Sequence, residues 1–150
     1  ATLERLHHPY AQTANCAVRR AAFEQVSGFT EEIRAGEDAD LCFRLQRAGW
    51  LLEARPHATV EHRGREAVRG MIGQLARHGS GAAWLQRRYP GSFPPSSARA
   101  LTGRIARSAQ SALTALARGE REQATGAMLD ILTACAFELG RLLPNRARRD

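Results

Sequence analysis

The sequence predicts a mixed α/β chain whose second half is entirely helical. Two observations support the mixed part: residues 12–18 (QTANCAV) and 50–63 (WLLEARPHATVEHR) are extended-looking runs, and helical patterns lie between them. A third observation concerns the remainder, where apolar residues recur at helical spacing from Arg65 onward. We therefore divide the chain into a mixed part, a helical extension with a Pro/Ser-rich linker, and a C-terminal helical hairpin with a basic tail: residues 1–65, 66–95 and 96–150.

The first predicted helix is short and lies in the segment RRAAFEQV, residues 19–26. Its spacing places Phe23 and Val26 on one inward face, and Gly28 follows as a turn residue. Residues 50–63, which follow the next helix, contain Pro56. Proline is rare inside a central strand, so this segment is expected to form two short extended pieces.

The second predicted helix spans residues 38–48 and ends at Gly49. Its apolar residues recur at i, i+4 and i+7, which predicts one packed face: Leu41, Leu45 and Ala48. Charged residues share the same spacing on a second face: Asp40, Arg44 and Arg47. We expect this second face to be solvated, with Asp40 and Arg44 forming an ion pair in the favourable order.

The remainder of the chain predicts a helix near residues 66–88, a break at GSFPPSS, and two further helices over 97–118 and 120–143. Gly119 leaves only a short connection between the last two, which favours an antiparallel pair packed on each other and on the preceding helix. The last of them carries an apolar stripe: Met128, Leu132, Cys135, Leu139 and Leu142. The final NRARRD reads as a solvated basic tail.

Composition excludes several classes of protein. The 43% hydrophobic and 25% charged content is that of a globular domain rather than a disordered chain. Three widely spaced cysteines without a CxxC pair indicate neither a zinc site nor a disulfide framework, and they suit a reducing cytoplasm. The longest apolar stretch is broken by charges and is shorter than the ~20 residues of a membrane span.

Two adjacent carboxylates, Glu37 and Asp38, stand at the start of the helix over 38–48. The unpaired N–H groups and the macrodipole at a helix N-terminus favour negative charge there. One interpretation is that either residue is an N-cap. The other is that the carboxylate is functional.

Five features in order decide between these interpretations: NCAVRR, then FEQVSGF, then GEDADLCFRL, a glycine, and ATVEH. Their order and spacing resemble the second half of the catalytic domain of family-two inverting glycosyltransferases. These enzymes have the Rossmann-like GT-A fold. The resemblance implies that residues 1–65 are the acceptor-side part of such an α/β domain. It also implies that the sequence is part of a longer protein.

In that family the aspartate of the Glu-Asp pair is the general base, which here would be Asp38. Glu37 would lie beside the acceptor or brace Asp38. The resemblance implies transfer of a sugar from a nucleotide-diphosphate donor to a hydroxyl of a saccharide or lipid-linked acceptor, with inversion. A helix N-terminus would keep the Asp38 carboxylate ionised and oriented.

The resemblance also implies a divalent metal, Mn²⁺ or Mg²⁺. His62, in VEHRGR, matches a position where relatives place a histidine near the metal and the diphosphate, and imidazole is an acceptable Mn²⁺ ligand. The alternative is a surface histidine. Asp38 and Asp40 form a D-x-D pattern, but the family's metal-binding D-x-D lies upstream, so we do not assign it here.

Residues 74–78 (QLARH) resemble the Q-x-x-R-W element of processive members. The resemblance implies that Gln74 and Arg77 bind the acceptor or the diphosphate, although His78 replaces the tryptophan and leaves processivity open. An amphipathic helix that carries Gln74 and Arg77 by chance is the alternative. The following segment, RHGSGAAWLQRRYPG, is loosely similar to family-two enzymes that include the mycofactocin glycosyltransferases.

A competing interpretation is a basic helical module, because the net charge is +7. Such a module would bind nucleic acid or an anionic membrane surface. The chain has no helix-turn-helix or RNP-like pattern, so we expect no nucleic-acid partner. We expect a cytoplasmic protein that contacts the inner membrane face through the C-terminal helices, unless these helices serve core packing alone.

Overall fold

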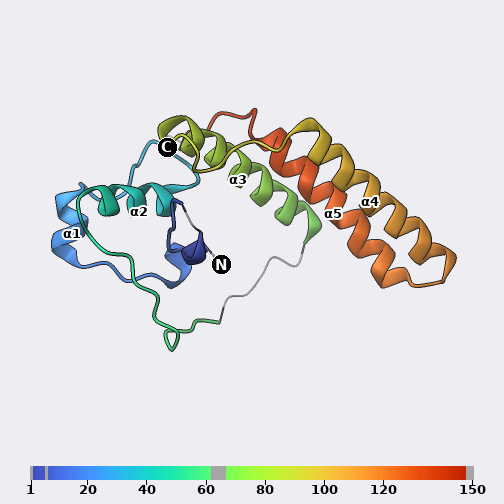
Figure 1. Cartoon of the computed structure of the whole chain (residues 1–150), viewed down its shortest axis with the longest axis horizontal. Coiled ribbons are helices and arrows are strands. Elements are labelled where there is room, and N and C mark those ends of the chain that lie inside the picture. Colours follow the sequence, from blue (N-terminus) through green and yellow to red (C-terminus); the bar gives the residue numbers. More distant parts are fainter. Residues whose placement is uncertain (1, 6, 62–66, 148–150) are drawn as a thin grey trace.

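The computed structural model describes residues 2–5, 7–61 and 67–147 (Figure 1). Two 3₁₀ turns, η1 (Thr2–Glu4) and η2 (Thr13–Asn15), precede the α-helices of this part of the chain. These helices are α1 (Arg20–Gln25), α2 (Glu37–Arg47), α3 (Val68–Arg88), α4 (Ala98–Ala117) and α5 (Arg121–Gly140). The helices lie close to where the sequence patterns predicted them.

The predicted α/β class is wrong, because no strand and no Rossmann-like sheet forms among the described residues. Residues 12–18 contain η2, and residues 50–61 are irregular around a turn at Pro56. A strand is stable only when a neighbouring strand pairs with its backbone N–H and C=O groups. The two segments are joined by a side-chain hydrogen bond from Asn15 Nδ2 to the Ala58 carbonyl, 2.7 Å long, and not by a ladder.

Helix α2 begins and ends at glycines, as the sequence predicted for its end. Gly36 is the N-cap residue with a φ of 87°, a left-handed conformation that glycine adopts without strain. At the other end Gly49 has a φ of 89°, and the Trp50 N–H donates to the Leu45 carbonyl at 3.0 Å. This is a Schellman ending, so the last carbonyls of the helix are satisfied.

The predicted packed and solvated faces of α2 are only partly right: Arg47 is exposed as expected, but Ala48, expected to pack, is exposed as well. Leu41 and Leu45 pack on Ala22 of α1, while Ala39 and Phe43 on the next side pack on α3. Asp40, expected to be exposed, is 1% exposed. The structure confirms its ion pair with Arg44, at 2.9 Å, and the ion pair is therefore largely buried rather than solvated.

Two further donors satisfy the buried Asp40 carboxylate. Thr30 Oγ1 donates to Oδ2 at 2.6 Å and the Tyr89 hydroxyl donates to Oδ1 at 2.5 Å. Burial and this hydrogen bond raise the pKa of Tyr89. Because the partners come from the loop before α2, from α2 and from the end of α3, the cluster fixes the first turn of α2 in place.

Helices α3, α5 and α4 lie side by side, with α5 between the other two (Figure 1). Small residues let the backbones of α3 and α5 approach closely. A Cβ on Gly79 would lie 2.0 Å from the Phe137 carbonyl oxygen, and one on Gly140 would lie 2.2 Å from the Ala76 carbonyl oxygen. The predicted helical hairpin and its packing on the helix near 66–88 are confirmed.

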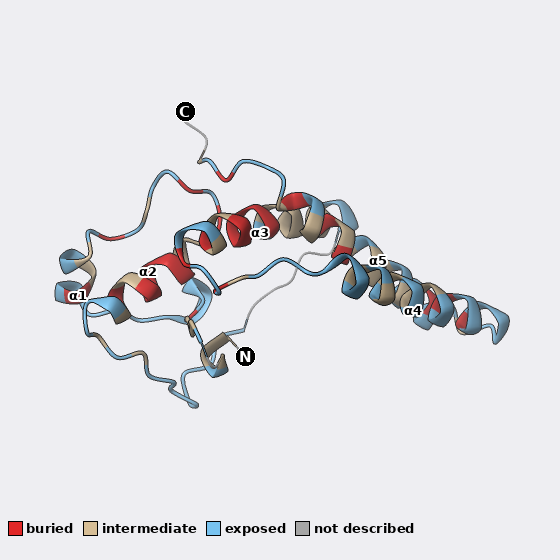
Figure 2. Ribbon diagram, turned by 45° about the horizontal axis from the view of Figure 1, so that its top comes forward, coloured by how far each residue is buried: buried red, intermediate tan, exposed pale blue. Residues whose placement is uncertain are grey.

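The predicted apolar stripe of α5 does not face this interface. The buried positions of α5 are all small residues, namely Ala124, Ala134, Ala136 and Gly140 (Figure 2). Of the predicted stripe, Met128, Leu132 and Leu139 are exposed and Cys135 is half-buried. Exposed apolar side chains of the hairpin are Leu113, Leu116, Met128, Leu132 and Leu139. No helix in the described ranges is long and apolar enough to span a bilayer.

Candidate active site

Four of the five predicted site residues line one cavity of about 300 Å³. Glu37 and Asp38 reach it from the first turn of α2, and Gln74 and Arg77 from α3. His62, the predicted metal ligand, lies outside the described residues. The predicted position of Glu37 and Asp38 at a helix start is confirmed, with Gly36 as the N-cap in place of either carboxylate.

The loop before α2 lies directly on α3. A Cβ on Gly81 would stand 2.7 Å from the Ala35 carbonyl oxygen, and one on Gly36 would stand 2.8 Å from Leu85 Cδ1. Only glycines allow this approach without displacing the neighbours. The contact brings the start of α2 against α3, which is why Asp38 and Arg77 share a cavity although they are far apart in the sequence.

Asn145, in the predicted solvated tail, holds the same loop and is 6% exposed, so that prediction was wrong at this position. Its Oδ1 accepts hydrogen bonds from the Arg34 N–H at 3.2 Å and the Ala35 N–H at 3.1 Å. Its Nδ2 donates to the Ala35 carbonyl at 2.8 Å. The side chain replaces the partners that a loop outside regular structure lacks. No local sequence pattern points to this contact, which spans 110 positions.

Replacement Asn145→Ala is expected to destabilise the chain by about 2–3 kcal/mol, because it leaves buried backbone N–H and C=O groups without partners. Asn15→Ala is the matched control: Asn15 is exposed and makes one hydrogen bond, so its loss should cost less than about 1 kcal/mol. Urea unfolding followed by circular dichroism measures both. Equal midpoints for the two variants would contradict the role assigned to Asn145.

The Asp38 carboxylate is half-buried in the cavity wall. Burial is the main cause that raises the pKa of Asp38, and the charge of Glu37 adds to it. The Ala39 N–H, which donates to Oδ1 at 2.8 Å, opposes the rise, and so does His78. The Asp38 carboxylate thus borders the cavity and can accept a proton there.

Because the pKa of Asp38 is higher in the folded chain than in the unfolded chain, ionising this group costs stability as the pH rises through that window. Asp38→Asn is therefore expected to raise the thermal midpoint at pH 7. The gain should disappear near pH 3, where the carboxyl is protonated in both states. Thermal scans at the two pH values test this, with the exposed Glu24→Gln as control. A gain of equal size at both pH values would contradict it.

Cationic and aromatic side chains complete the cavity. Arg34 comes from the loop before α2, and His78 follows Arg77 on α3. Neither Arg34 nor Arg77 forms an ion pair with another described residue. The aromatic wall is formed by Tyr10, Phe93 and Phe137. Sequence reasoning missed Arg34 and this wall, because no periodic pattern or motif distinguishes them.

The described residues contain no group of three His, Cys, Asp or Glu side chains that would hold a metal ion. The side chains around Asp38 therefore do not fit a divalent metal by themselves.

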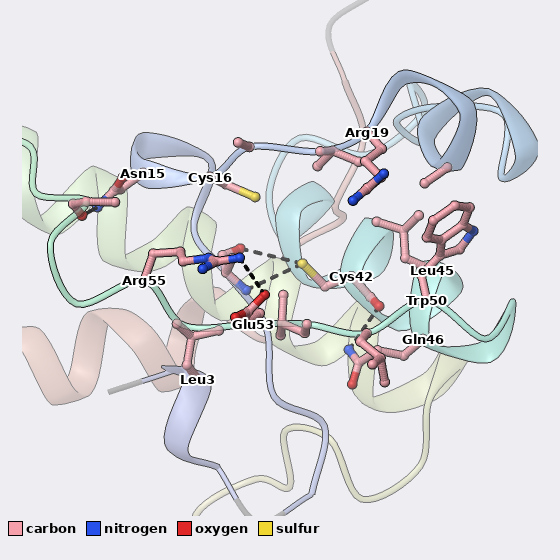
Figure 3. A pocket seen from close by; sticks show the side chains of 17 residues that line it. Leu3, Asn15, Cys16, Arg19, Cys42, Leu45, Gln46, Trp50, Glu53 and Arg55 are labelled. Carbon is pink, nitrogen blue, oxygen red and sulfur yellow. Dashed lines mark hydrogen bonds and ion pairs between the residues drawn. The ribbon is translucent and has the colours of Figure 1, made fainter.

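A larger hollow, of about 500 Å³, is lined by Cys42, Leu45 and Gln46 of α2 (Figure 3). Cys42 lies in its wall, with its sulfur accepting from the Ala11 N–H at 3.4 Å. The carboxylate that lines this hollow is that of Glu53, which is exposed and forms an ion pair with Arg55 at 2.9 Å. This hollow holds none of the predicted site residues and offers no half-buried carboxylate to act as a base, so the smaller cavity is the better candidate.

Comparison with known proteins identifies the family. Residues 7–121 match Glycosyl transferase family group 2. The chain belongs to this family. The family recognised from the motifs is thus confirmed, while its expected sheet is absent from the described part of the chain.

Two curated relatives are similar to part of the chain. The pre-mycofactocin glycosyltransferases from two strains of Mycobacterium tuberculosis are each 40% identical to this family-two chain over 86 residues. The aligned region is 57% of this chain and 18% of each relative, so the chain spans a minor part of their length. No solved structure matches the chain.

Proposed function

We propose that this chain forms the acceptor-side part of an inverting glycosyltransferase, with Asp38 as the general base. The donor is a nucleotide-diphosphate sugar and the acceptor presents a hydroxyl. The observation that carries the proposal is the joint position of Asp38, Gln74 and Arg77 around one cavity in a chain of this family. Fold and family by themselves would not assign these roles.

In the proposed reaction the acceptor hydroxyl gives its proton to the Asp38 carboxylate while its oxygen attacks the anomeric carbon of the donor sugar. The bond from that carbon to the diphosphate oxygen breaks, and the electron pair leaves with the diphosphate. Attack opposite the leaving group inverts the anomeric configuration. Asp38 suits this role because a helix start holds it and its raised pKa makes it a stronger base than a solvated carboxylate.

The cations around the cavity suit the charges of the reaction. Arg77 and Arg34, which have no ion-pair partner among the described residues, would stabilise the negative charge that develops on the leaving diphosphate. Gln74 would hydrogen-bond the acceptor, and Glu37 would orient it beside Asp38. Mn²⁺ or Mg²⁺ with His62 as a ligand remains a prediction from the family resemblance.

The test is the stereochemistry of the product. The full-length protein is incubated with a panel of nucleotide-diphosphate sugars and a hydroxyl acceptor, and NMR of the product gives the anomeric configuration. A product with the opposite configuration to the donor supports the proposal. Retention of configuration would overturn it, because a single displacement assisted by Asp38 cannot retain.

A second candidate function is attachment of the hairpin to an anionic membrane surface on the cytoplasmic side. The exposed apolar side chains of α4 and α5 favour it, Leu113 being 69% exposed, together with the net charge of +7. Co-sedimentation with vesicles that contain anionic lipid, compared with the Leu113→Asp variant, tests this. Equal recovery of both proteins with the vesicles would reject it.

A further inference from the structure

A third hollow adjoins the Asp38 cavity and is used by nothing described above. It is a groove of about 450 Å³ whose floor is formed by α5. Leu75 of α3 forms one wall, and residues from Ser96 to Arg107, mostly on α4, form the other. In Figure 1 the three helices that form it lie alongside one another.

The groove and the Asp38 cavity meet at a shared residue. Phe137 of α5 lines both. On α3, Gln74 lines the cavity and its neighbour Leu75 lines the groove. The linker between α3 and α4 does the same, with Phe93 in the cavity and Ser96 in the groove. The cavity and the groove therefore border each other at Phe137.

The groove lining mixes apolar residues with polar and charged ones, which are Ser96, Arg104, Arg107, Thr133 and Glu138. Thr133 Oγ1 donates to the Asp130 carbonyl at 2.9 Å, and Glu138 is ion-paired with Arg141 at 3.7 Å. Leu75, Leu101, Ala134 and Phe137 contribute aliphatic and aromatic surface from three helices, and their backbone groups are paired within those helices. At the rim, Arg104 and Ser108 both bind Asp130, with the Ser108 Oγ to Asp130 Oδ2 distance at 2.6 Å. Because Arg104 and Asp130 are ion-paired with each other, their side chains are less available to hydrogen-bond the hydroxyl groups of a sugar. The apolar residues between these paired groups offer surface that hydrocarbon would cover favourably.

We propose that this groove binds an apolar chain of the acceptor, so that the acceptor is an amphiphile whose hydroxyl reaches Asp38 and whose hydrocarbon lies along α5. The assignment of the hydroxyl to Asp38 rests on the proposed function. The binding of hydrocarbon in the groove does not, and it can be measured without catalysis.

Octyl β-D-glucoside, kept below its micelle concentration, is the probe, and methyl β-D-glucoside is its short-chain control. Isothermal titration with the 150-residue chain should show at least about tenfold tighter binding of the octyl compound, because each fully buried methylene contributes about fourfold in affinity. Equal affinity for the two glucosides would overturn the proposal.

Variants locate the binding. Ala100 is exposed and lines the groove, so Ala100→Phe should fill it from outside without disturbing the core and should weaken octyl binding by about tenfold. Ala106→Phe, exposed on the same helix but outside the groove, is its matched control. Leu101→Asn against Leu113→Asn gives a second pair on α4. Unchanged octyl binding in both groove variants would overturn the proposal, and circular dichroism checks that each variant is folded.

Kinetics of the full-length enzyme then separate the two proposals. A lower KM for the octyl glucoside, lost in Ala100→Phe at unchanged kcat, supports both. Transfer to the two glucosides with equal KM would reject the groove and leave the proposed function in place. Octyl binding in the groove without sugar transfer from any donor would reject the proposed function and leave the groove proposal in place.

Discussion

Replacement Asp38→Asn in the full-length enzyme is expected to lower kcat by about 10²–10⁴-fold, the usual contribution of a positioned general base. The KM for the donor should change little, because the diphosphate is bound by the arginines around the cavity and not by this carboxylate. Asparagine has nearly the same shape as aspartate but cannot take a proton. The Ala39 N–H can still donate to its side-chain oxygen, so the first turn of α2 should stay in place.

Steady-state kinetics against pH give the decisive measurement. In the parent enzyme kcat/KM should rise with pH through the pKa of Asp38, which burial raises above its ordinary value, because only the ionised carboxylate accepts the proton. Asp38→Asn should abolish this rise as well as the rate. Glu24→Gln, a change on the exposed side of α1, should alter neither. An Asp38→Asn variant with parental kcat would remove Asp38 from the reaction.

Replacement Gly79→Ala is expected to cost about 3 kcal/mol or more of folding free energy, which is a drop of roughly 10 °C in the thermal midpoint. The new methyl group would stand 2.0 Å from the Phe137 carbonyl oxygen, which belongs to the backbone and cannot rotate away. The helices must therefore separate. Because α3 carries Gln74 and Arg77 and α5 carries Phe137, the separation should also distort the cavity at Asp38.

Gly126→Ala is the matched control, because Gly126 also lies inside α5 but has nothing within 4 Å of its added Cβ. Alanine is the better helix former, so this change should stabilise the chain by about 0.5–1 kcal/mol. Calorimetry of both variants compares the two signs directly. Stabilisation of similar size in both would show that helix propensity, and not the close contact of α3 with α5, controls the effect.

The sequence by itself predicted the helices and the acidic start of α2. Helical spacing, the glycine at the end of α2 and the short connection at Gly119 are local signals, and local signals are fixed by neighbours within a few positions. The same holds for the ion pair of Asp40 with Arg44, four residues apart. The motif order also predicted the family correctly, because it rests on residue types and spacing alone.

The tertiary structure decided everything that depends on distant partners. The segments over 12–18 and 50–61 have the composition of strands, but a strand requires a paired neighbour, and none is present among the described residues. Asp40 is buried because Tyr89, 49 positions away, donates to it. The apolar stripe of α5 is exposed because glycine and alanine, not leucine, allow α3 and α4 to approach.

The candidate site also depends partly on local sequence and partly on tertiary packing. Sequence could name Glu37, Asp38, Gln74 and Arg77 but could not show that they share a cavity. Their meeting depends on the close contact of Ala35 with Gly81 and on the hydrogen bonds of Asn145 to the loop before α2. A local pattern determines which backbone conformation each segment prefers. Only the packing of the folded chain decides which side chains face one another, because that packing depends on shape and hydrogen-bond partners contributed from far along the chain.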